Sequence, residues 1–209
     1  MAQKFKQITF DPKRCRAEIE EFGTLLRTKA ELSERGEIHP FFKAREQLSA
    51  FVGSYIRNIG PATEICFEYQ FYGDFASDLI VGVKAHRRFC VVEFEDGRAE
   101  SIFKPSQNKN TKVWSQRFEQ GFSQIVDWYS MLDDLKKVER FKRDFGDGHV
   151  RFSAMLIIGR DAGLPEPYDR FRLDWRTDKV SVDNNHVECV TFDELYNHMD
   201  RHLKLNTGF

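Results

Sequence analysis

The chain has 209 residues, of which 41% are hydrophobic and 31% are charged, and its formal net charge is −1 at pH 7. This composition is typical of one globular domain and excludes a disordered chain. We find neither an apolar run long enough to cross a membrane nor a signal-like start, so we expect a cytoplasmic protein without membrane contact. The near-neutral charge excludes a globally basic nucleic-acid-binding protein, and such contacts would depend on local patches.

The first part of the chain predicts a short strand and two helices. Residues 4–10 have the pattern of a strand, and Asp11 followed by Pro12 starts a helix that we expect to end near residue 31. Residues 33–39 predict a loop, and residues 41–56 predict a second helix.

The next part of the chain predicts a strand and a β-hairpin. Residues 64–71 alternate as a strand, with Glu68 and Gln70 on one face, which is turned either to a site or to solvent. Residues 73–97, GDFASDLIVGVKAHRRFCVVEFEDG, contain two short apolar runs rich in β-branched and aromatic side chains. The basic residues 84–88 separate these runs and predict the turn of the hairpin.

The predicted hairpin brings three carboxylates together. If its turn is symmetric about Ala85 and His86, Asp78 lies opposite Glu93, and Glu95 shares their face because strand side chains alternate. Oxygen ligands of this kind are what Mg²⁺ prefers, so the spacing predicts a site for Mg²⁺ or Mn²⁺. The alternative is a sheet edge with solvated acids, since a one-residue bulge would turn Glu93 to the other face.

A polar loop follows the hairpin. Residues 98–115 contain Lys104, Lys109 and Lys112 among amide and hydroxyl side chains, a few residues after the carboxylates. Side chains of these types contact nucleic-acid phosphates, so the three lysines are candidate nucleic-acid-binding residues. A loop that is only solvated has the same composition, and both interpretations stay open.

An amphipathic helix is predicted over residues 115–138, with Gln124 beside its apolar stripe. Residues 136–143 are the most basic octet in the chain. On a helix surface, such an octet forms either a solvated face or a contact with nucleic acid.

The last part of the chain predicts a buried strand, a hairpin and two helices. The apolar run 152–159 fits a central strand that follows a parallel crossover. Residues 165–176 predict a helix, and residues 179–190 predict a hairpin. Thr191 and Glu194 form a capping box that opens the last helix.

Cysteines and histidines give no zinc signature. His198 and His202 are four residues apart on the last helix, but no Glu stands where a zincin motif needs it, so we expect two surface histidines. The cysteines are far apart and form no CxxC pair, so we expect neither disulfides nor zinc. They are Cys15, Cys66, Cys90 and Cys189.

The carboxylate pattern resembles a known nuclease core. Asp78, followed by Glu93-Phe94-Glu95 at the end of an apolar strand, resembles the PD-(D/E)xK nucleases, whose acids bind metal. The segments PFFKAREQLSAFVGSY, GDFASDLIVG, VVEFEDG, GFSQIVDWY and TFDELY resemble the nuclease domain of the Shedu anti-phage defence family over residues 18–196. One departure is Glu95, which stands where the general motif has lysine.

This resemblance implies a fold. We expect an α/β protein with a PD-(D/E)xK-like (restriction-endonuclease-like) core, in which helices flank a mixed central sheet of about four to six strands. One domain would span residues 1–209, with a core over about residues 18–196, a short N-terminal lead and a C-terminal helix. A helix before the sheet can lend a carboxylate to the site in such folds, so Glu18 or Glu21 either has that role or belongs to a solvated face.

The resemblance also implies a metal-dependent nuclease with DNA as the expected substrate. Asp78 and Glu93 would hold Mg²⁺ or Mn²⁺, Glu95 would help hold the metal or deprotonate water, and Gln124 would orient water or phosphate. The alternatives are a catalytically inactive domain that binds nucleic acid or a partner as a regulatory subunit, and a structural subunit. Family members often carry an N-terminal sensing region, so activation through a sensing partner or a homo-oligomer is a further expectation.

Overall fold

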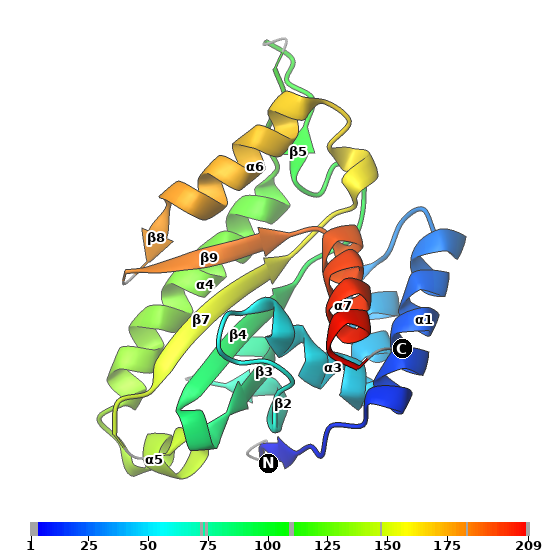
Figure 1. The fold of residues 1–209 in the computed structure, drawn as a ribbon. Helices are drawn as coiled ribbons and strands as arrows, with labels where there is room; N and C mark the ends of the chain where they lie inside the picture. The colour runs from blue at the N-terminus through cyan, green and yellow to red at the C-terminus, as the bar shows by residue number, and fades with distance from the viewer. Residues whose placement is uncertain are drawn as a thin grey trace.

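The computed structural model describes residues 4–71, 73, 75–108, 111–146, 148–182 and 184–207. Helices cover both faces of a mixed β-sheet (Figure 1). The α-helices are α1 (Pro12–Thr28), α2 (His39–Lys43), α3 (Glu46–Phe51), α4 (Gln116–Leu135), α5 (Glu139–Phe145), α6 (Pro167–Lys179) and α7 (Phe192–Thr207).

Among the described residues, the main sheet has seven strands in the order β1-β2-β3-β4-β7-β9-β8. Strands β1 to β4 pair antiparallel, β4 pairs parallel with β7, and β7 pairs parallel with β9. These strands are β1 (Lys6–Gln7), β2 (Glu64–Gln70), β3 (Ala76–Val83), β4 (Arg88–Phe94), β7 (Arg151–Ile157), β9 (Asn185–Val190) and β8 (Ser181–Val182). The α/β class and the mixed sheet are confirmed, as is the parallel crossover into β7.

The expected number of strands was too low because the sheet extends at its edges. The strand predicted over residues 4–10 and the hairpin predicted over residues 179–190 both join the main sheet, as β1 at one edge and as β9 and β8 at the other. The predicted polar loop after β4 also contains a small separate hairpin, made of β5 (Phe103–Lys104) and β6 (Val113–Trp114).

The register of the β3–β4 hairpin is the predicted one. Leu79 pairs with Val92, and Val83 pairs with Arg88. A 3₁₀ turn over Lys84–His86 joins the two strands, and the parallel neighbour β7 begins beside the start of β4.

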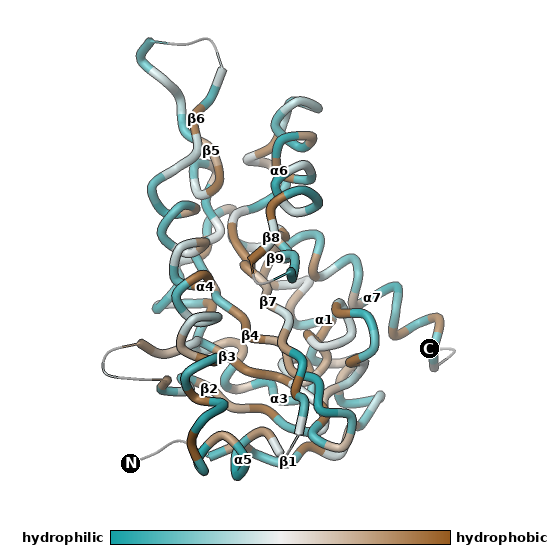
Figure 2. The backbone as a smooth tube through the Cα atoms, turned by 90° about the vertical axis from the view of Figure 1, so that its left-hand side faces the viewer, coloured by the Kyte–Doolittle hydropathy of each residue, from teal (hydrophilic) through white to brown (hydrophobic). Residues whose placement is uncertain are grey.

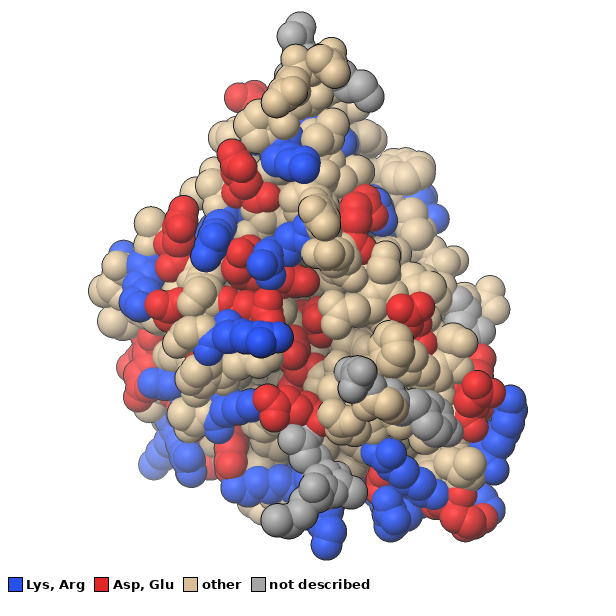
Figure 3. Space-filling model, turned by 180° about the vertical axis from the view of Figure 1, so that it is seen from behind, with Lys and Arg blue, Asp and Glu red and all other residues tan. Residues whose placement is uncertain are grey.

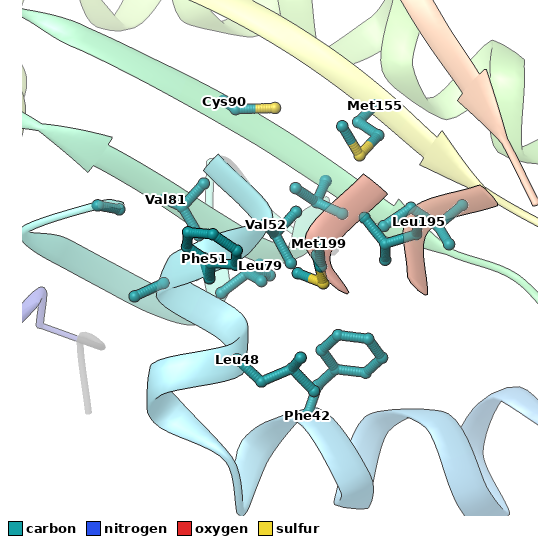
Figure 4. Close-up of a cluster of buried hydrophobic side chains, with 14 of the residues drawn as sticks. Phe42, Leu48, Phe51, Val52, Leu79, Val81, Cys90, Met155, Leu195 and Met199 are labelled. Carbon is teal, nitrogen blue, oxygen red and sulfur yellow. The ribbon is translucent and has the colours of Figure 1, made fainter. Parts of the chain in front are cut away.

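Alternation along the strands separates two apolar cores. Ile80 and Val91 pack with residues of α4 on one face, whereas Leu79 and Val92 pack with residues of α1, α3 and α7 on the other. Figure 2 shows the strands between α4 on one side and α1 and α7 on the other. Figure 4 shows part of the second core, where side chains of β3, β4 and β7 meet those of α3 and α7. The four cysteines are buried and free.

The segment between α1 and β2 differs from the prediction. Residues predicted as a loop form a π-helix, η1 (Glu34–Ile38), which leads directly into α2. The predicted single helix is divided into α2, α3 and a 3₁₀ turn over Val52–Tyr55. A contact distant in sequence explains the second start, because Glu18 of α1 accepts a hydrogen bond from the backbone N–H of Leu48 in the first turn of α3, at 2.7 Å.

Glu18 therefore stabilises the fold from a buried position, and removal of its carboxylate should lower the stability of the protein. We expect Glu18→Ala to lower the free energy of unfolding by about 1–2 kcal/mol, because the Leu48 N–H would lose its acceptor. Glu20→Ala is the matched control, since Glu20 is exposed on the same helix. Urea unfolding of the three proteins measures the difference, and equal midpoints for the two variants would show that Glu18 does not cap α3.

Candidate functional site

The ends of β3 and β4 open into an acidic cleft of about 730 Å³. All four residues predicted to act in catalysis line this cleft, namely Asp78, Glu93, Glu95 and Gln124. Asp78 and Glu93 have the same strand parity as Ile80 and Val91, which turns them toward α4, where Gln124 lies. Figure 3 shows Asp and Glu side chains gathered in a hollow near the middle of one face, with Lys and Arg side chains around it. Further lining residues are Glu34, Arg35, His39, Pro40, Lys43, Glu68 and Ala76.

Asp78 links the two strands of the hairpin and a helix beyond them. Its Oδ2 accepts a hydrogen bond from the Phe94 N–H at 2.7 Å, and its Oδ1 lies 3.2 Å from Nε2 of His39. Burial alone would lower the pKa of His39, but the neighbouring Asp78 carboxylate outweighs burial and raises this pKa above its usual value. The Asp78 carboxylate is therefore held by a backbone donor and lies beside an imidazole, which makes no hydrogen bond of good geometry to it.

Of the three carboxylates, Glu93 has the fewest hydrogen-bond donors or positive charges beside it. It is only 6% exposed, and its buried Oε2 has no hydrogen-bond partner. Burial raises the pKa of Glu93 well above its usual value, and the charges of Asp78 and Glu95 raise it further. A buried acceptor without a partner is unfavourable, so a cation or a proton at this position would stabilise the site.

Glu95 is buried between β4 and the start of α4. Burial raises its pKa to about 7, although the guanidinium of Arg117, with Nη1 at 2.6 Å from Glu95 Oε2, opposes that rise. Gly121 makes this close approach possible, because a Cβ at that position would lie 3.1 Å from Cγ of Glu95 and 2.9 Å from Cδ1 of Leu156. Within the described ranges, no group of three or more His, Cys, Asp and Glu side chains is arranged to hold a metal ion.

Sequence reasoning missed Arg117, Gly121 and Glu34. Arg117, Gly121 and Gln124 are spaced i, i+4 and i+7, which places them on one helical face, and this spacing was the signal that could have found the first two. Glu34 comes from η1, a segment predicted as a loop, and its Oε2 lies 3.0 Å from Nη1 of Arg117. No pattern in the sequence indicated that Glu34 would reach the cleft.

The helix carboxylate in the cleft is therefore Glu34, not Glu18 or Glu21. Glu18 accepts from the α3 backbone, and Glu21 forms an ion pair with Arg45 at 2.6 Å. Glu68 lines the cleft with an ion pair to Lys43 and a left-handed backbone at φ 51°. Such a backbone conformation is costly for a residue other than glycine and is often found at functional sites.

The candidate nucleic-acid-binding lysines have different surroundings. Lys104 is exposed on β5, while Nζ of Lys112 lies 2.8 Å from Oδ2 of the buried Asp169, an ion pair that ties the β5–β6 hairpin to α6. Lys109 lies outside the described residues. A role of these lysines in binding nucleic acid stays a prediction.

The two histidines of α7 are more enclosed than expected. The ring of His198 packs on Tyr55 and the ring of His202 packs on Phe51, and Nε2 of His198 lies 3.1 Å from the carbonyl oxygen of Ser54. They serve packing of α7 against the end of α3 and the 3₁₀ turn that follows it.

The fold and the cleft define an α/β protein in which one end of a mixed sheet carries buried carboxylates. The family model for the Shedu protein SduA, C-terminal, matches residues 31–196. The chain therefore belongs to that family, and the resemblance inferred from the sequence is confirmed at the family level. A comparison with curated proteins gives no match. None of the helices in the described part of the chain is long and apolar enough to cross a membrane.

The packing of Glu95 against α4 gives a prediction about Gly121. Helix propensity alone would make Gly121→Ala more stable by about 1 kcal/mol. We expect the opposite, a loss of about 1 kcal/mol, because the added methyl group would press on Glu95 and Leu156 in a packed interior. Ser123→Ala, at an exposed position of the same helix, is the control, and its stability should equal or slightly exceed that of the unaltered protein. Thermal unfolding distinguishes these outcomes, and a more stable Gly121→Ala protein would show that Glu95 is not held against α4.

Proposed function

We propose that the protein is a metal-dependent nuclease that hydrolyses phosphodiester bonds, with DNA as substrate, and that it acts in anti-phage defence in the cytoplasm. The observation that carries the proposal is the convergence of Asp78, Glu93 and Glu95 in one cleft beside Gln124. Membership of the Shedu family supports the role in defence. The order of the acids along β3 and β4 supports a PD-(D/E)xK-like core as the scaffold.

Although no three His, Cys, Asp or Glu side chains among the described residues are arranged to hold a metal ion, Mg²⁺ is usually bound by only one or two carboxylates, with water and substrate phosphate oxygens as its other ligands. The cleft offers the Asp78 carboxylate and the partnerless Oε2 of Glu93 for this purpose, so it fits Mg²⁺ or Mn²⁺. Asp78 and Glu93 would hold the metal, and Glu95 would either complete its coordination or accept a proton from water. The bound cation would supply activation of a water molecule and neutralise charge on the scissile phosphate. Gln124 would orient water or phosphate through an amide that both donates and accepts hydrogen bonds.

Positive charge beside the carboxylates supports a phosphate-containing substrate. Arg117 places a guanidinium next to Glu95, the residue that replaces the motif lysine, and Arg35 and Lys43 line the same cleft. A phosphodiester that enters the cleft would meet these cations as well as the metal. Further contacts to the phosphates of the bound nucleic acid, outside the cleft, would come from Lys104, Lys109 and Lys112.

One alternative has a specific observation in its favour. Glu95 replaces the motif lysine and is paired with Arg117, and Asp78 lies beside His39, so protein groups already stand next to two of the three carboxylates. A domain in which these pairs persist would bind nucleic acid or a protein partner as a regulatory subunit without turnover. Assembly of several copies, or a sensing partner, is a further expectation for either function.

Cleavage of supercoiled plasmid in Mg²⁺, Mn²⁺ and EDTA tests the proposal. We expect nicked or linear product with either metal, none in EDTA, and only background product with Asp78→Ala or Glu93→Ala, because each change removes a metal ligand. Asp133→Ala, which removes an exposed carboxylate of α4, is the control and should cleave like the unaltered protein. Cleavage by the two cleft variants at the rate of the unaltered protein would exclude these residues from the mechanism. DNA binding without any cleavage by the unaltered protein would favour the regulatory alternative.

A further inference from the structure

A second cavity, of about 280 Å³, lies where the β3–β4 turn meets the start of β7. Its lining consists of His86, Arg87, Arg88, His149 and Arg151, so every lining residue is an arginine or a histidine. Across the described ranges, none of the five forms an ion pair. The cavity is at the beginning of β4, whereas the acidic cleft is at the end of that strand.

The strand register forces two of these arginines together. Arg88 and Arg151 are direct partners in the parallel ladder between β4 and β7, so their side chains stand next to each other on one face of the sheet. The Arg151 N–H donates to the carbonyl oxygen of Arg87 at 2.9 Å, which keeps the third arginine beside them. Like charges in neighbouring positions of a sheet repel and destabilise it, unless an anion lies between them.

Arg87 is held in a conformation that arginine rarely adopts. Its backbone is left-handed, with φ 54°, at a turn position that glycine or asparagine would occupy without strain. Its guanidinium lies against Gly148, where a Cβ would come within 2.7 Å of Nη1. Backbone strain combined with repulsion between neighbouring arginines is unfavourable for the fold alone and therefore indicates a function at this position.

Other basic segments of the chain converge on the same end of the sheet. Nζ of Lys84 donates to the carbonyl oxygen of Arg143 at 2.6 Å, which joins the basic turn to α5. Lys136 lines an adjacent cavity of about 350 Å³ together with His149 and Arg151. The most basic octet of the sequence thus lies beside the basic turn of the hairpin, but its cations form ion pairs with neighbouring acids such as Asp133 and Asp144, whereas the five residues of the cavity form none within the described part of the chain.

We propose that His86, Arg87, Arg88, His149 and Arg151 form a phosphate-binding site. Its ligand is a phosphate group, carried either by a nucleotide or by a nucleic-acid backbone. Guanidinium groups bind phosphate oxygens through paired N–H donors, and the imidazoles add further donors. This site is separate from the acidic cleft and does not depend on metal-dependent hydrolysis there.

Melting curves in inorganic phosphate, at constant ionic strength set with sodium chloride, test the site. We expect phosphate to raise the melting temperature of the unaltered protein and of Arg57→Gln, a control at an exposed arginine after α3. Arg88→Gln and Arg151→Gln should bind phosphate about tenfold more weakly, since each lacks a charge-assisted hydrogen bond. Without phosphate, both variants should melt higher than the unaltered protein because a repulsion has been removed.

Arg87→Gly removes a guanidinium and, at the same time, the strain of a left-handed backbone conformation, which glycine adopts readily. It should be more stable than the unaltered protein without phosphate and should gain less from phosphate. The proposal is overturned if phosphate does not raise the melting temperature of the unaltered protein, or if it raises that of all four variants by the same amount as in the unaltered protein.

Binding of a duplex oligonucleotide in EDTA, at several salt concentrations, identifies the source of the phosphate group. If the site serves nucleic acid, Arg88→Gln and Arg151→Gln should lower the slope of log affinity against log salt by about one for each lost contact. A duplex affinity that stays unchanged while the response to inorganic phosphate is lost identifies a free phosphate or a nucleotide as the ligand.

Discussion

The register between β3 and β4 is the constraint on which the acidic cleft depends. Because Leu79 pairs with Val92, Asp78 and Glu93 lie on the same face of neighbouring strands at the end of the hairpin. A slip of one residue would turn Glu93 toward the α1, α3 and α7 side and would bury Phe94 on the wrong face. The same register aligns Arg88 with Arg151 at the opposite end of β4, so one strand carries an acidic end and a basic end.

The acidic cleft contains buried negative charges, and most of them have a positive group or a hydrogen-bond donor beside them. Arg117 compensates Glu95, and His39 and a backbone N–H compensate Asp78, whereas Glu93 keeps a buried oxygen without a partner. The elements that supply the compensating groups, α2 and α4, are held by the two apolar cores on either side of the sheet. The fold therefore maintains one unfavourable carboxylate in a position where a divalent cation would stabilise it.

Local patterns predicted much of this arrangement. The hairpin register follows from the position of its turn, the last helix begins at the predicted box of Thr191 and Glu194, and the apolar run of β7 lies in the centre of the sheet. Contacts between residues far apart in sequence were not predictable in this way. The cap that Glu18 gives to α3 starts a new helix inside an apolar pattern, and Glu34 reaches the cleft only because η1 packs against α4 through Arg117.

The central claim is that Asp78 and Glu93 together hold a divalent cation, and diffraction from crystals soaked in Mn²⁺ measures this most directly. At a wavelength where manganese scatters anomalously, we predict an anomalous peak in the cleft within about 2.0–2.4 Å of oxygens from both carboxylates. The peak should be absent from crystals of Glu93→Gln grown and soaked in the same way. A cleft without manganese, in crystals that bind the ion elsewhere at millimolar concentration, would contradict the claim.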